Sequence, residues 1–219
     1  MQAPISFTVS GQQLWLSPMK AIFWESRRFL IVSDLHFGKT GHFRKSGIAV
    51  PQHVYRNDLQ RLFSLVQYFQ PSGIIIVGDF FHSAANREAD LFAKWRNDHS
   101  GIGIRLVKGN HDILPIEWYR ENNIDLHDGI LRDGPFCFTH EWTPDLSQAN
   151  EQYIFSGHIH PGVRISGQGR QSLRLPCFYF DQNHAILPAF GDFTGLAIIE
   201  PSPEARVFVL AEQQIISLQ

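Results

Sequence analysis

The sequence predicts an α/β sandwich in which two stacked mixed β-sheets are flanked by helices, formed as one domain by residues 1–219. Two observations predict this fold. Between residues 29 and 107, three strand-like apolar runs alternate with two segments of helical spacing, which is typical of parallel strands joined by helical crossovers. Beyond residue 123, nearly every apolar run has the length of a strand, so a second, β-rich half is expected.

The elements of the first half follow from local patterns. Short strands are expected at residues 5–9, 14–16, 21–24 and 29–33. Helical spacing runs from Pro51 to about residue 69, and a proline suits the first turn of a helix because its missing N–H would be unpaired there. The continuous apolar run 73–77 predicts a strand covered on both faces. A helix at 85–99, a strand at 104–107 and a short helix at 115–122 follow.

The second half is expected to be almost entirely β-structure. Its strands are expected at residues 130–131, 136–138, 153–155, 163–166, 173–180, 185–187, 196–199 and 207–210.

Composition excludes several classes of protein. Apolar residues make up 43% of the chain, with 18 Phe, which is enough for a full core. No apolar stretch is long enough to span a membrane, and the N-terminus lacks the basic and apolar segments of a secretory signal, so a cytoplasmic protein without a membrane partner is expected. Cys137 and Cys177 lie in strand-like runs without a CxxC pattern and are expected to be buried free thiols. The net charge of −2 argues against a large basic surface for nucleic acid, although not against a local one.

Five short strings carry metal-binding side chains, and each follows a strand-like run. The ends of adjacent strands meet at one edge of a sheet, so these side chains are expected to converge. Carboxylate, amide and imidazole ligands together suit Mn²⁺, Fe²⁺ or Zn²⁺. The strings are Asp34-Leu35-His36, Gly78-Asp79-Phe80-Phe81-His82, Gly109-Asn110-His111-Asp112, Thr139-His140 and Gly157-His158-Ile159-His160.

Local geometry supports this convergence. In an extended segment, residues i and i+2 point the same way, so Asp34 pairs with His36 and His158 with His160. A carboxylate such as Asp79 at the end of an apolar strand is unfavourable unless cations neutralise it. Gly78, Gly109 and Gly157 are expected to let the backbone turn sharply before the ligands.

In this order, the strings resemble the signature of the calcineurin-like metallophosphoesterases: D-x-H, G-D-x-x-(D/E/H), G-N-H-(D/E), H and G-H-x-H. The resemblance spans residues 34–160. It implies two divalent metal ions, with Mn²⁺ expected first and Fe²⁺ or Zn²⁺ as alternatives. It also implies which residues hold them: Asp34, His36 and His160 for the first ion, Asn110, His140 and His158 for the second, and Asp79 as a bridge.

The chemistry that this resemblance implies is phosphoester hydrolysis by a hydroxide held between the two ions. The catalytic residues are then expected to be Asn110, His111 and Asp112. Asn110 and protonated His111 meet the charge on the phosphoryl oxygens, and His111 also protonates the departing alkoxide. Asp112 is expected to orient the His111 imidazole and raise its pKa.

Two further segments resemble a narrower group, the ligase-associated DNA damage response endonucleases (the PdeM group). The first is Asp34-Leu35-His36-Phe37-Gly38-Lys39 followed by residues 42–51, and the second is the run Leu187-Pro188-Ala189-Phe190-Gly191 with Phe193-Thr194-Gly195. This resemblance implies a DNA endonuclease or phosphodiesterase in DNA repair. It also implies an ATP-dependent DNA ligase, an exonuclease and a helicase-like protein as partners. Asp192 departs from the group, where a small neutral residue is expected, and an acid facing the site would disfavour a polyanion.

Substrate binding is expected from Lys39, Arg44 and His82. Lys39, His42, Arg44 and Lys45 form a basic cluster beside a ligand string, which either grips flanking phosphates or is an ordinary solvated loop. Two other functions stay open: a phosphoesterase for a small nucleotide, sugar-nucleotide or phosphoprotein substrate, and a non-catalytic scaffold. The sequence does not choose the metal, the oligomeric state or the preferred DNA structure.

Overall fold

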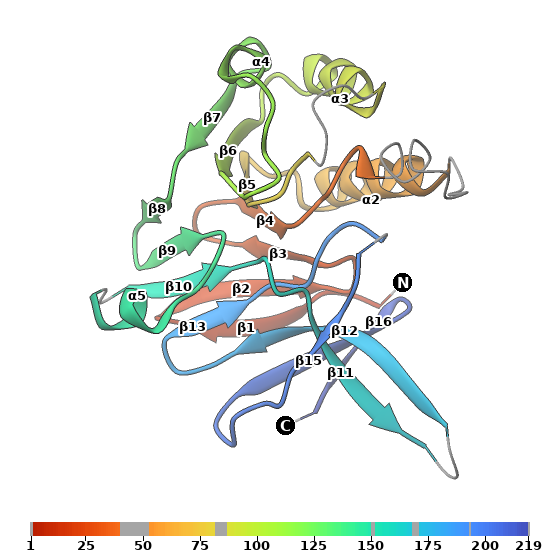
Figure 1. Cartoon of the computed structure of the whole chain (residues 1–219), viewed down its shortest axis with the longest axis vertical. Coiled ribbons are helices and arrows are strands. Elements are labelled where there is room, and N and C mark those ends of the chain that lie inside the picture. The colour runs from red at the N-terminus through yellow and green to blue at the C-terminus, as the bar shows by residue number, and fades with distance from the viewer. Residues whose placement is uncertain are drawn as a thin grey trace.

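Two β-sheets pack face to face with helices outside them in the computed structural model (Figure 1). The structure describes residues 2–39, 53–81, 87–149, 152–167, 171–192 and 194–218.

The first sheet has seven strands in the order of the sequence. Its first four strands pair antiparallel, and β4 begins a parallel series that ends at the edge strand β7. The strands are β1 (Ile5–Val9), β2 (Gln12–Ser17), β3 (Ala21–Trp24), β4 (Phe29–Ser33), β5 (Gly73–Val77), β6 (Gly103–Val107) and β7 (Ile124–His127).

The second sheet has nine strands of mixed direction, among them a parallel trio β9, β10 and β13. In spatial order they are β14 (Ala197–Ile198), β11 (Pro161–Ser166), β12 (Ser172–Phe180), β13 (His184–Ile186), β10 (Tyr153–Ser156), β9 (Phe136–Thr139) and β8 (Ile130–Asp133), with β15 (Arg206–Ala211) beside β12 and β16 (Gln214–Ser217) beside β15.

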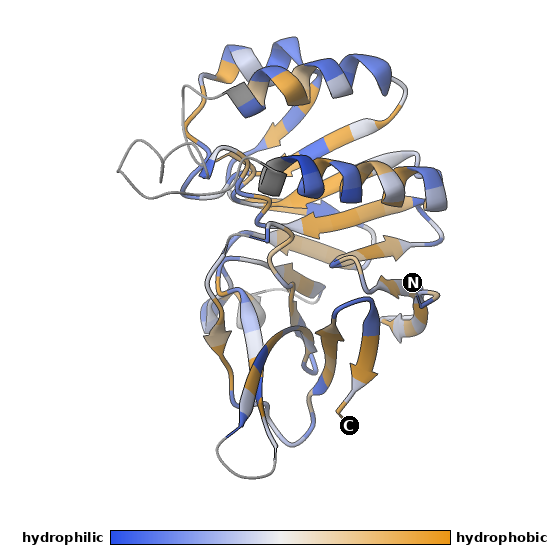
Figure 2. Cartoon of the chain, turned by 90° about the vertical axis from the view of Figure 1, so that its right-hand side faces the viewer, coloured by the Kyte–Doolittle hydropathy of each residue, from blue (hydrophilic) through white to orange (hydrophobic). Residues whose placement is uncertain are grey.

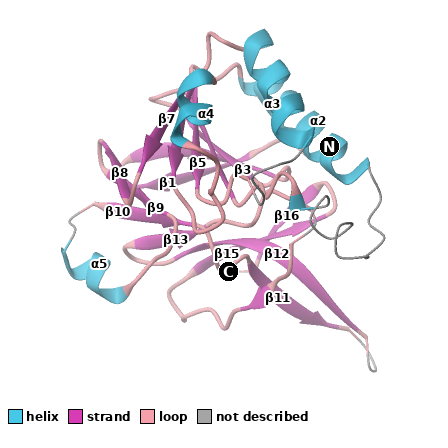
Figure 3. Cartoon of the chain, turned by 45° about the horizontal axis from the view of Figure 1, so that its top comes forward, coloured by secondary structure: helices cyan, strands magenta, loops and turns pink. Residues whose placement is uncertain are grey.

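Helices cover the outer face of the first sheet, where α2 (His53–Phe69), α3 (Arg87–Asp98) and α4 (Ile116–Glu121) lie together (Figure 3). The short helix α5 (Pro144–Ala149) lies apart from them and connects β9 to β10 of the second sheet. Figure 2 shows largely apolar strands inside the sandwich and helices that carry both polar and apolar segments. This distribution is expected of helices with one face on a sheet and one in water.

The central strand β5 shows how the two layers are divided. All five of its residues are buried. Ile74 and Ile76 pack against the helices, whereas Ile75 and Val77 pack into the core between the sheets. This alternation is the period-2 geometry of a strand covered on both faces.

Most elements lie where the sequence predicts them, with ends shifted by one or two residues. The expected starts of the first helix at Pro51 and of the second at residue 85 lie outside the described residues. The prediction missed β7, β16 and α5. Strand β7 reads Ile-Asp-Leu-His, with only two apolar residues, because an edge strand needs little apolar surface.

The two cysteines are free and buried, as the sequence predicts. Burial raises the pKa of the Cys177 thiol to about 12, which keeps it protonated and unreactive. In the part of the chain that the structure describes, no helix has the length and apolar character needed to cross a membrane.

The core between the sheets should dominate stability. Leu16 of β2 is 0% exposed in this core, and Leu173 of β12 is 64% exposed. Leu16→Ala should therefore lower the free energy of unfolding by about 2–5 kcal/mol, because it removes buried methyl groups and leaves a cavity. Leu173→Ala, the matched control, should change it by less than about 0.5 kcal/mol. Urea unfolding followed by circular dichroism measures both, and equal losses would contradict the assignment of the core.

Candidate metal centre

The seven predicted metal ligands come together where the carboxyl ends of strands from both sheets meet. Those of the first sheet follow β4, β5 and β6, and those of the second follow β9 and β10. The donor atoms form two clusters, and each cluster draws on both sheets. Neither sheet alone could build either one.

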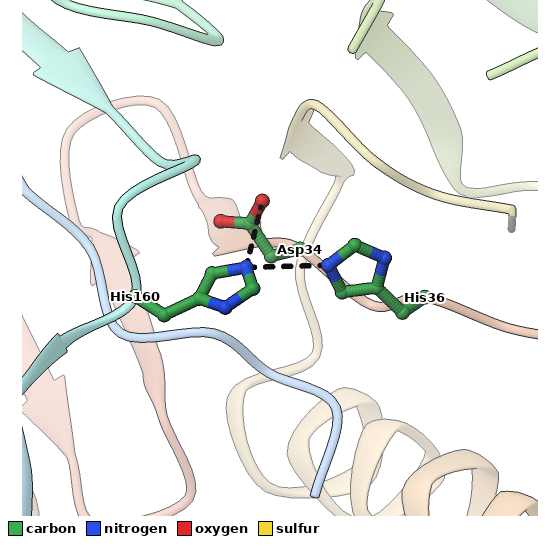
Figure 4. Close-up of side chains that lie close together, drawn as sticks. All are labelled: Asp34, His36 and His160. Carbon is green, nitrogen blue, oxygen red and sulfur yellow. Dashed lines mark hydrogen bonds and ion pairs between the residues drawn. The ribbon is translucent and has the colours of Figure 1, made fainter. Parts of the chain in front are cut away.

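The first cluster consists of Asp34, His36 and His160, whose side chains point toward one another (Figure 4). The Nε2 atoms of His36 and His160 lie 3.2 Å apart, and His160 Nε2 lies 3.5 Å from Asp34 Oδ1. Asp34 and His36 follow β4, and His160 lies directly before β11.

The second cluster consists of Asp79, His140 and His158, joined by Asn110. His140 Nε2 lies 3.1 Å from His158 Nδ1 and 3.0 Å from Asn110 Oδ1. Asp79 Oδ1 lies 3.5 Å from the same His140 nitrogen. The other three donor atoms thus lie within 3.5 Å of His140 Nε2.

Asp79 also faces the first cluster. Its Oδ2 lies 3.8 Å from His36 Nε2, while Oδ1 faces His140. The carboxylate therefore stands between the two clusters with one oxygen toward each, as a bridging ligand would.

The donor set fits divalent cations better than it fits hydrogen bonds. Metal bonds of about 2.0–2.2 Å put neighbouring ligand atoms about 3.0–3.6 Å apart, close to the distances in both clusters. His140 Nε2 faces three donor atoms at once, and a single N–H cannot satisfy all three. A cation at their centre would satisfy every one.

Charge leads to the same conclusion. Asp34 is 0% and Asp79 2% exposed, and among the described residues all their ion pairs run to histidines. Two buried carboxylates this close together are costly unless positive charge neutralises them. Divalent ions would supply it.

The backbone at the ligands is not extended, which corrects the reasoning from sequence. Asp34, His36, Asp79, His158 and His160 all adopt left-handed conformations, with φ between 46° and 67°. The pairs of ligands converge as predicted, but not through the side-chain alternation of a strand. Such conformations are unfavourable for residues with a Cβ and concentrate at functional sites.

The ligand loops after β4 and β5 stay paired beyond the ends of their strands. The N–H of His36 donates to the Asp79 carbonyl at 2.9 Å, and that of Phe37 to the Phe80 carbonyl at 2.9 Å. The left-handed residues of these two loops therefore lie in neighbouring backbone segments that hydrogen-bond to each other.

Glycines in the strings act mainly by allowing close approach. Gly78 has φ +78°, as a sharp turn requires. Gly109 and Gly157 have no positive φ, and the expected turn at Gly109 is closed by the N–H of Asp112, which donates to the Gly109 carbonyl at 3.2 Å. A Cβ at Gly109 would overlap Asp79, and one at Gly157 would overlap Ser33 Oγ and Asp34.

Asp112 makes contacts that the sequence did not predict. Its buried carboxylate accepts hydrogen bonds from the backbone N–H groups of Phe80, Phe81 and Gly109 at 2.9–3.0 Å. These bonds fix the loop of Asp79 against the loop of Asn110. Burial raises the pKa of Asp112 to about 7, although the backbone N–H groups oppose this rise. Its orientation of the His111 ring stays a prediction.

His111 lies beside both clusters. Its backbone N–H donates to Asp79 Oδ1 at 2.9 Å, and its ring lies 5.6 Å from the ring of His36, centroid to centroid. The imidazole is half-buried at the edge of the centre.

Ser33 was missed by the sequence analysis. Its hydroxyl contacts Asp34 Oδ2 and lies 2.9 Å from the Val77 carbonyl. The backbone N–H of His158 donates to the same Asp34 oxygen at 3.0 Å. The same N–H lies 3.2 Å from Asp34 Oδ1, the oxygen that faces His160, so these contacts hold the whole carboxylate in place. A serine at the end of an otherwise apolar strand was the available signal.

The loop that contains residues 190–192, here called the C-terminal loop, contacts the backbone of Asp34. The N–H groups of Phe190 and Gly191 donate to the carbonyls of Ser33 and Asp34 at 2.8 and 3.1 Å. Asp192, the residue that departs from the resembled group, pairs with Lys20 at 2.8 Å and with Arg61 at 2.8 Å. Burial raises the pKa of Asp192, but the two cations outweigh it and the pKa lies below its usual value. The acid is thus neutralised locally.

Of the three predicted substrate-binding residues, only Lys39 lies in the described part of the chain. Burial lowers the pKa of its ammonium group, while Asp79 and Asp34 oppose this shift, so Lys39 lies within electrostatic reach of both carboxylates. Arg44 and His82 lie outside the described residues, as do His42 and Lys45.

Gly157→Ala should weaken binding of a divalent ion at the first cluster. The new Cβ would push Ser33 and the Asp34 carboxylate out of place, and loss of such supporting contacts typically costs tenfold to 100-fold in affinity. Isothermal titration with Mn²⁺ measures the change. Gly101→Ala is the control, because its Cβ would meet nothing within 4 Å. Equal affinities in the two variants would contradict this geometry.

Comparison with solved structures gives a strong match to one nuclease. The Pseudomonas putida nuclease MPE is 32% identical with a TM-score of 0.82, and the match covers 98% of this chain and 100% of that one. YfcE, a phosphoesterase from E. coli, is 15% identical with a TM-score of 0.42, and the match covers 86% of this chain and 96% of that one. No curated protein matches the sequence.

The family comparison agrees with the fold and the ligand clusters. The calcineurin-like phosphoesterase family matches residues 27–160, which include all seven candidate ligands. With two mixed sheets, two candidate metal clusters and this match, the chain belongs to the calcineurin-like phosphoesterases, a family of metal-dependent hydrolases.

Proposed function

We propose that this protein is a dinuclear-metal phosphodiesterase that cuts DNA as an endonuclease in DNA repair. The observation that carries the proposal is Asp79, whose two carboxylate oxygens face two separate clusters of ligands. The similarity to a nuclease over 98% of the chain supports nucleic acid as the substrate.

The chain's own side chains would hold the two ions. Asp34, His36 and His160 would hold one, Asn110, His140 and His158 the other, and Asp79 both. When bound, two such ions lower the pKa of a water molecule and neutralise phosphoryl oxygens. We favour Mn²⁺, with Fe²⁺ or Zn²⁺ as alternatives, because the mixed oxygen and imidazole donors suit all three.

Around these ligands, the chain offers groups for the phosphate itself. Asn110 has its Oδ1 toward His140, which leaves its amide N–H groups free to donate to a phosphoryl oxygen. His111 lies at the edge of the centre, where an imidazolium can protonate the departing alkoxide.

We assign Asp112 a positioning role. Both of its oxygens accept backbone hydrogen bonds that fix the Asp79 and Asn110 loops relative to each other. Among the described residues, these backbone groups are the hydrogen-bond partners of the Asp112 carboxylate. The carboxylate touches no predicted ligand side chain in the described part of the chain, so its influence on catalysis would come through loop geometry.

The pathway and location are part of the same proposal. An ATP-dependent DNA ligase, an exonuclease and a helicase-like protein are the partners that the resembled endonuclease group implies, and the cytoplasm is the expected compartment. Lys39, near the two carboxylates, would contact the substrate.

A second function is favoured by one observation. The formal net charge of −2 does not provide a broad basic surface, which suits a small nucleotide or sugar-nucleotide better than a long polyanion. Comparing hydrolysis of bis-p-nitrophenyl phosphate, p-nitrophenyl phosphate and DNA separates a diesterase from a monoesterase.

Metal content tests the dinuclear centre. The wild-type protein should retain two Mn²⁺ per chain after gel filtration, measured by elemental analysis. His158→Ala should retain about one, because only the second cluster loses a ligand. Chelation should lower the melting temperature of the wild type, since the two buried carboxylates lose their counter-charge. A wild-type content of one ion or none would contradict the proposal.

The leaving group tests His111. His111→Ala should lower kcat for DNA about 100-fold or more, because an alkoxide must be protonated as it leaves. The loss should be much smaller for bis-p-nitrophenyl phosphate, whose nitrophenolate leaves without a proton.

His99→Ala is the matched control, since His99 lies just before β6, at the end opposite the site. It should leave both rates unchanged. Equal losses for both substrates in His111→Ala would show that His111 does not act as the acid. No cleavage of nicked, flapped or single-stranded DNA by the Mn²⁺-loaded wild type would overturn the DNA substrate.

A further inference from the structure

A β-hairpin extends from the metal centre beyond the rest of the second sheet. Strand β11 begins at Pro161, directly after the candidate ligand His160, and pairs with β12 (Figure 1). Strand β14 pairs only with the first two residues of β11, and β15 pairs with β12 only from Cys177 onward. In the described residues, 163–166 and 172–175 therefore have only each other as strand partners. We call this two-stranded segment the arm.

The two faces of the arm differ. Val163 and Ile165 pair with Leu175 and Leu173 on one face, and three of these four pack against the outer apolar cluster of the second sheet. Because alternate residues point to opposite faces, the other face carries Arg164, Ser166, Ser172 and Arg174. Val163, Ile165 and Leu175 turn the apolar face toward the protein, whereas Leu173 and the arginine face are exposed to solvent.

Arg164 and Arg174 stand directly opposite each other in the antiparallel register. Like charges in this position weaken strand pairing, because opposed Cβ atoms lie only about 5 Å apart. Both arginines are exposed, and neither has an ion pair or a hydrogen bond to another described residue. An anion lying between them would relieve the repulsion.

The surrounding sequence strengthens this positive charge. No aspartate or glutamate occurs from residue 152 to residue 180, although the chain has 21 acidic residues in 219. Glu200, which follows the neighbouring strand β14, is the closest acid in the strand order and makes no ion pair with either arginine in the described structure. A local basic surface thus exists in a protein of net charge −2.

The distance to the metal centre suits a nucleic-acid strand. Arg164 follows His160 by four residues, so their Cα atoms are at most about 14 Å apart. One strand of a duplex advances about 3.4 Å per nucleotide. When the lengths of the side chains are added, a phosphate at the arm would lie a few nucleotides from the phosphate at the metal centre.

We propose that the arginine face of the arm, formed by Arg164 and Arg174, is a second binding site for the nucleic-acid backbone, which holds phosphates a few nucleotides from the bond that is cut. This proposal rests on the proposed function. The arginine face would supply local phosphate contacts that the net charge of −2 does not lead one to expect. Arginine suits the role because its planar guanidinium donates two parallel hydrogen bonds to phosphate.

The test compares a long substrate with a short one. Mn²⁺-loaded wild type, Arg164→Gln, Arg174→Gln and the double variant are assayed on single-stranded DNA and on bis-p-nitrophenyl phosphate. The double variant should raise KM severalfold for DNA and leave kcat and KM for the small diester unchanged. The slope of log KM against log salt concentration for DNA should fall by about 0.7 for each arginine removed, and by about 1.4 for both.

Two controls separate the arm from general charge. Arg206→Gln removes an exposed arginine of β15 whose strand partner Phe180 lies six residues along β12 from Arg174, a distance of about 20 Å. It should leave the slope unchanged. The double variant with lysine at both positions should retain most of the slope, because it keeps both charges.

Each outcome decides one question. An unchanged slope in the double glutamine variant, with DNA cleavage intact, would show that the arm does not bind nucleic acid. The proposed function would not be affected. Loss of activity on the small diester as well would show that the arm supports the metal centre and does not bind substrate. A wild-type protein that cuts the small diester but no nucleic acid overturns the proposed function, and the arm falls with it.

Discussion

The geometry of the site depends on how two buried carboxylates are neutralised. Asp34 and Asp79 lie where the sheets meet, and their described ion pairs run only to histidines. Backbone N–H groups of His158 and His111 stabilise them in part. An unneutralised buried charge costs several kcal/mol, so positive charge between the sheets is required. Because each cluster draws ligands from both sheets, the binding of cations and the packing of the sandwich are thermodynamically coupled.

A second constraint is the backbone of the ligands. Five of the seven candidate ligands have left-handed conformations, which is unfavourable by roughly 1–3 kcal/mol for each residue. The surroundings hold them in place: the Asp79 loop pairs with the Asp34 loop, and Asp112 fixes the Asp79 loop from behind. Backbone hydrogen bonds of the two loops therefore offset the unfavourable conformations of these residues.

The sequence predicts well which side chains come together, because each candidate ligand follows an apolar run whose strand character is local, as in residues 73–77 before Asp79. It predicts their geometry poorly, because the sign of φ at Asp34 or His158 is decided by neighbours distant in the chain. The contacts of Asp112 and the neutralisation of Asp192 were missed for the same reason. The opposition of Arg164 and Arg174 depends on the pairing register of two strands, which the expected strand ranges do not set. Strand β7 was missed since an edge strand carries little apolar surface.

The C-terminal loop shows that the matched family segment is not a self-sufficient unit. The match ends at residue 160, yet Phe190 and Gly191 donate their N–H groups to the carbonyls of Ser33 and Asp34. Arg61 of α2 holds the same loop through Asp192 and the Phe190 carbonyl. A chimaera that grafts residues 27–160 onto a foreign C-terminal half would keep every candidate ligand but lose the backbone hydrogen bonds that position Ser33 and Asp34. The loop at residues 190–192 is therefore part of the structure that positions Asp34, although it contributes no candidate ligand of its own.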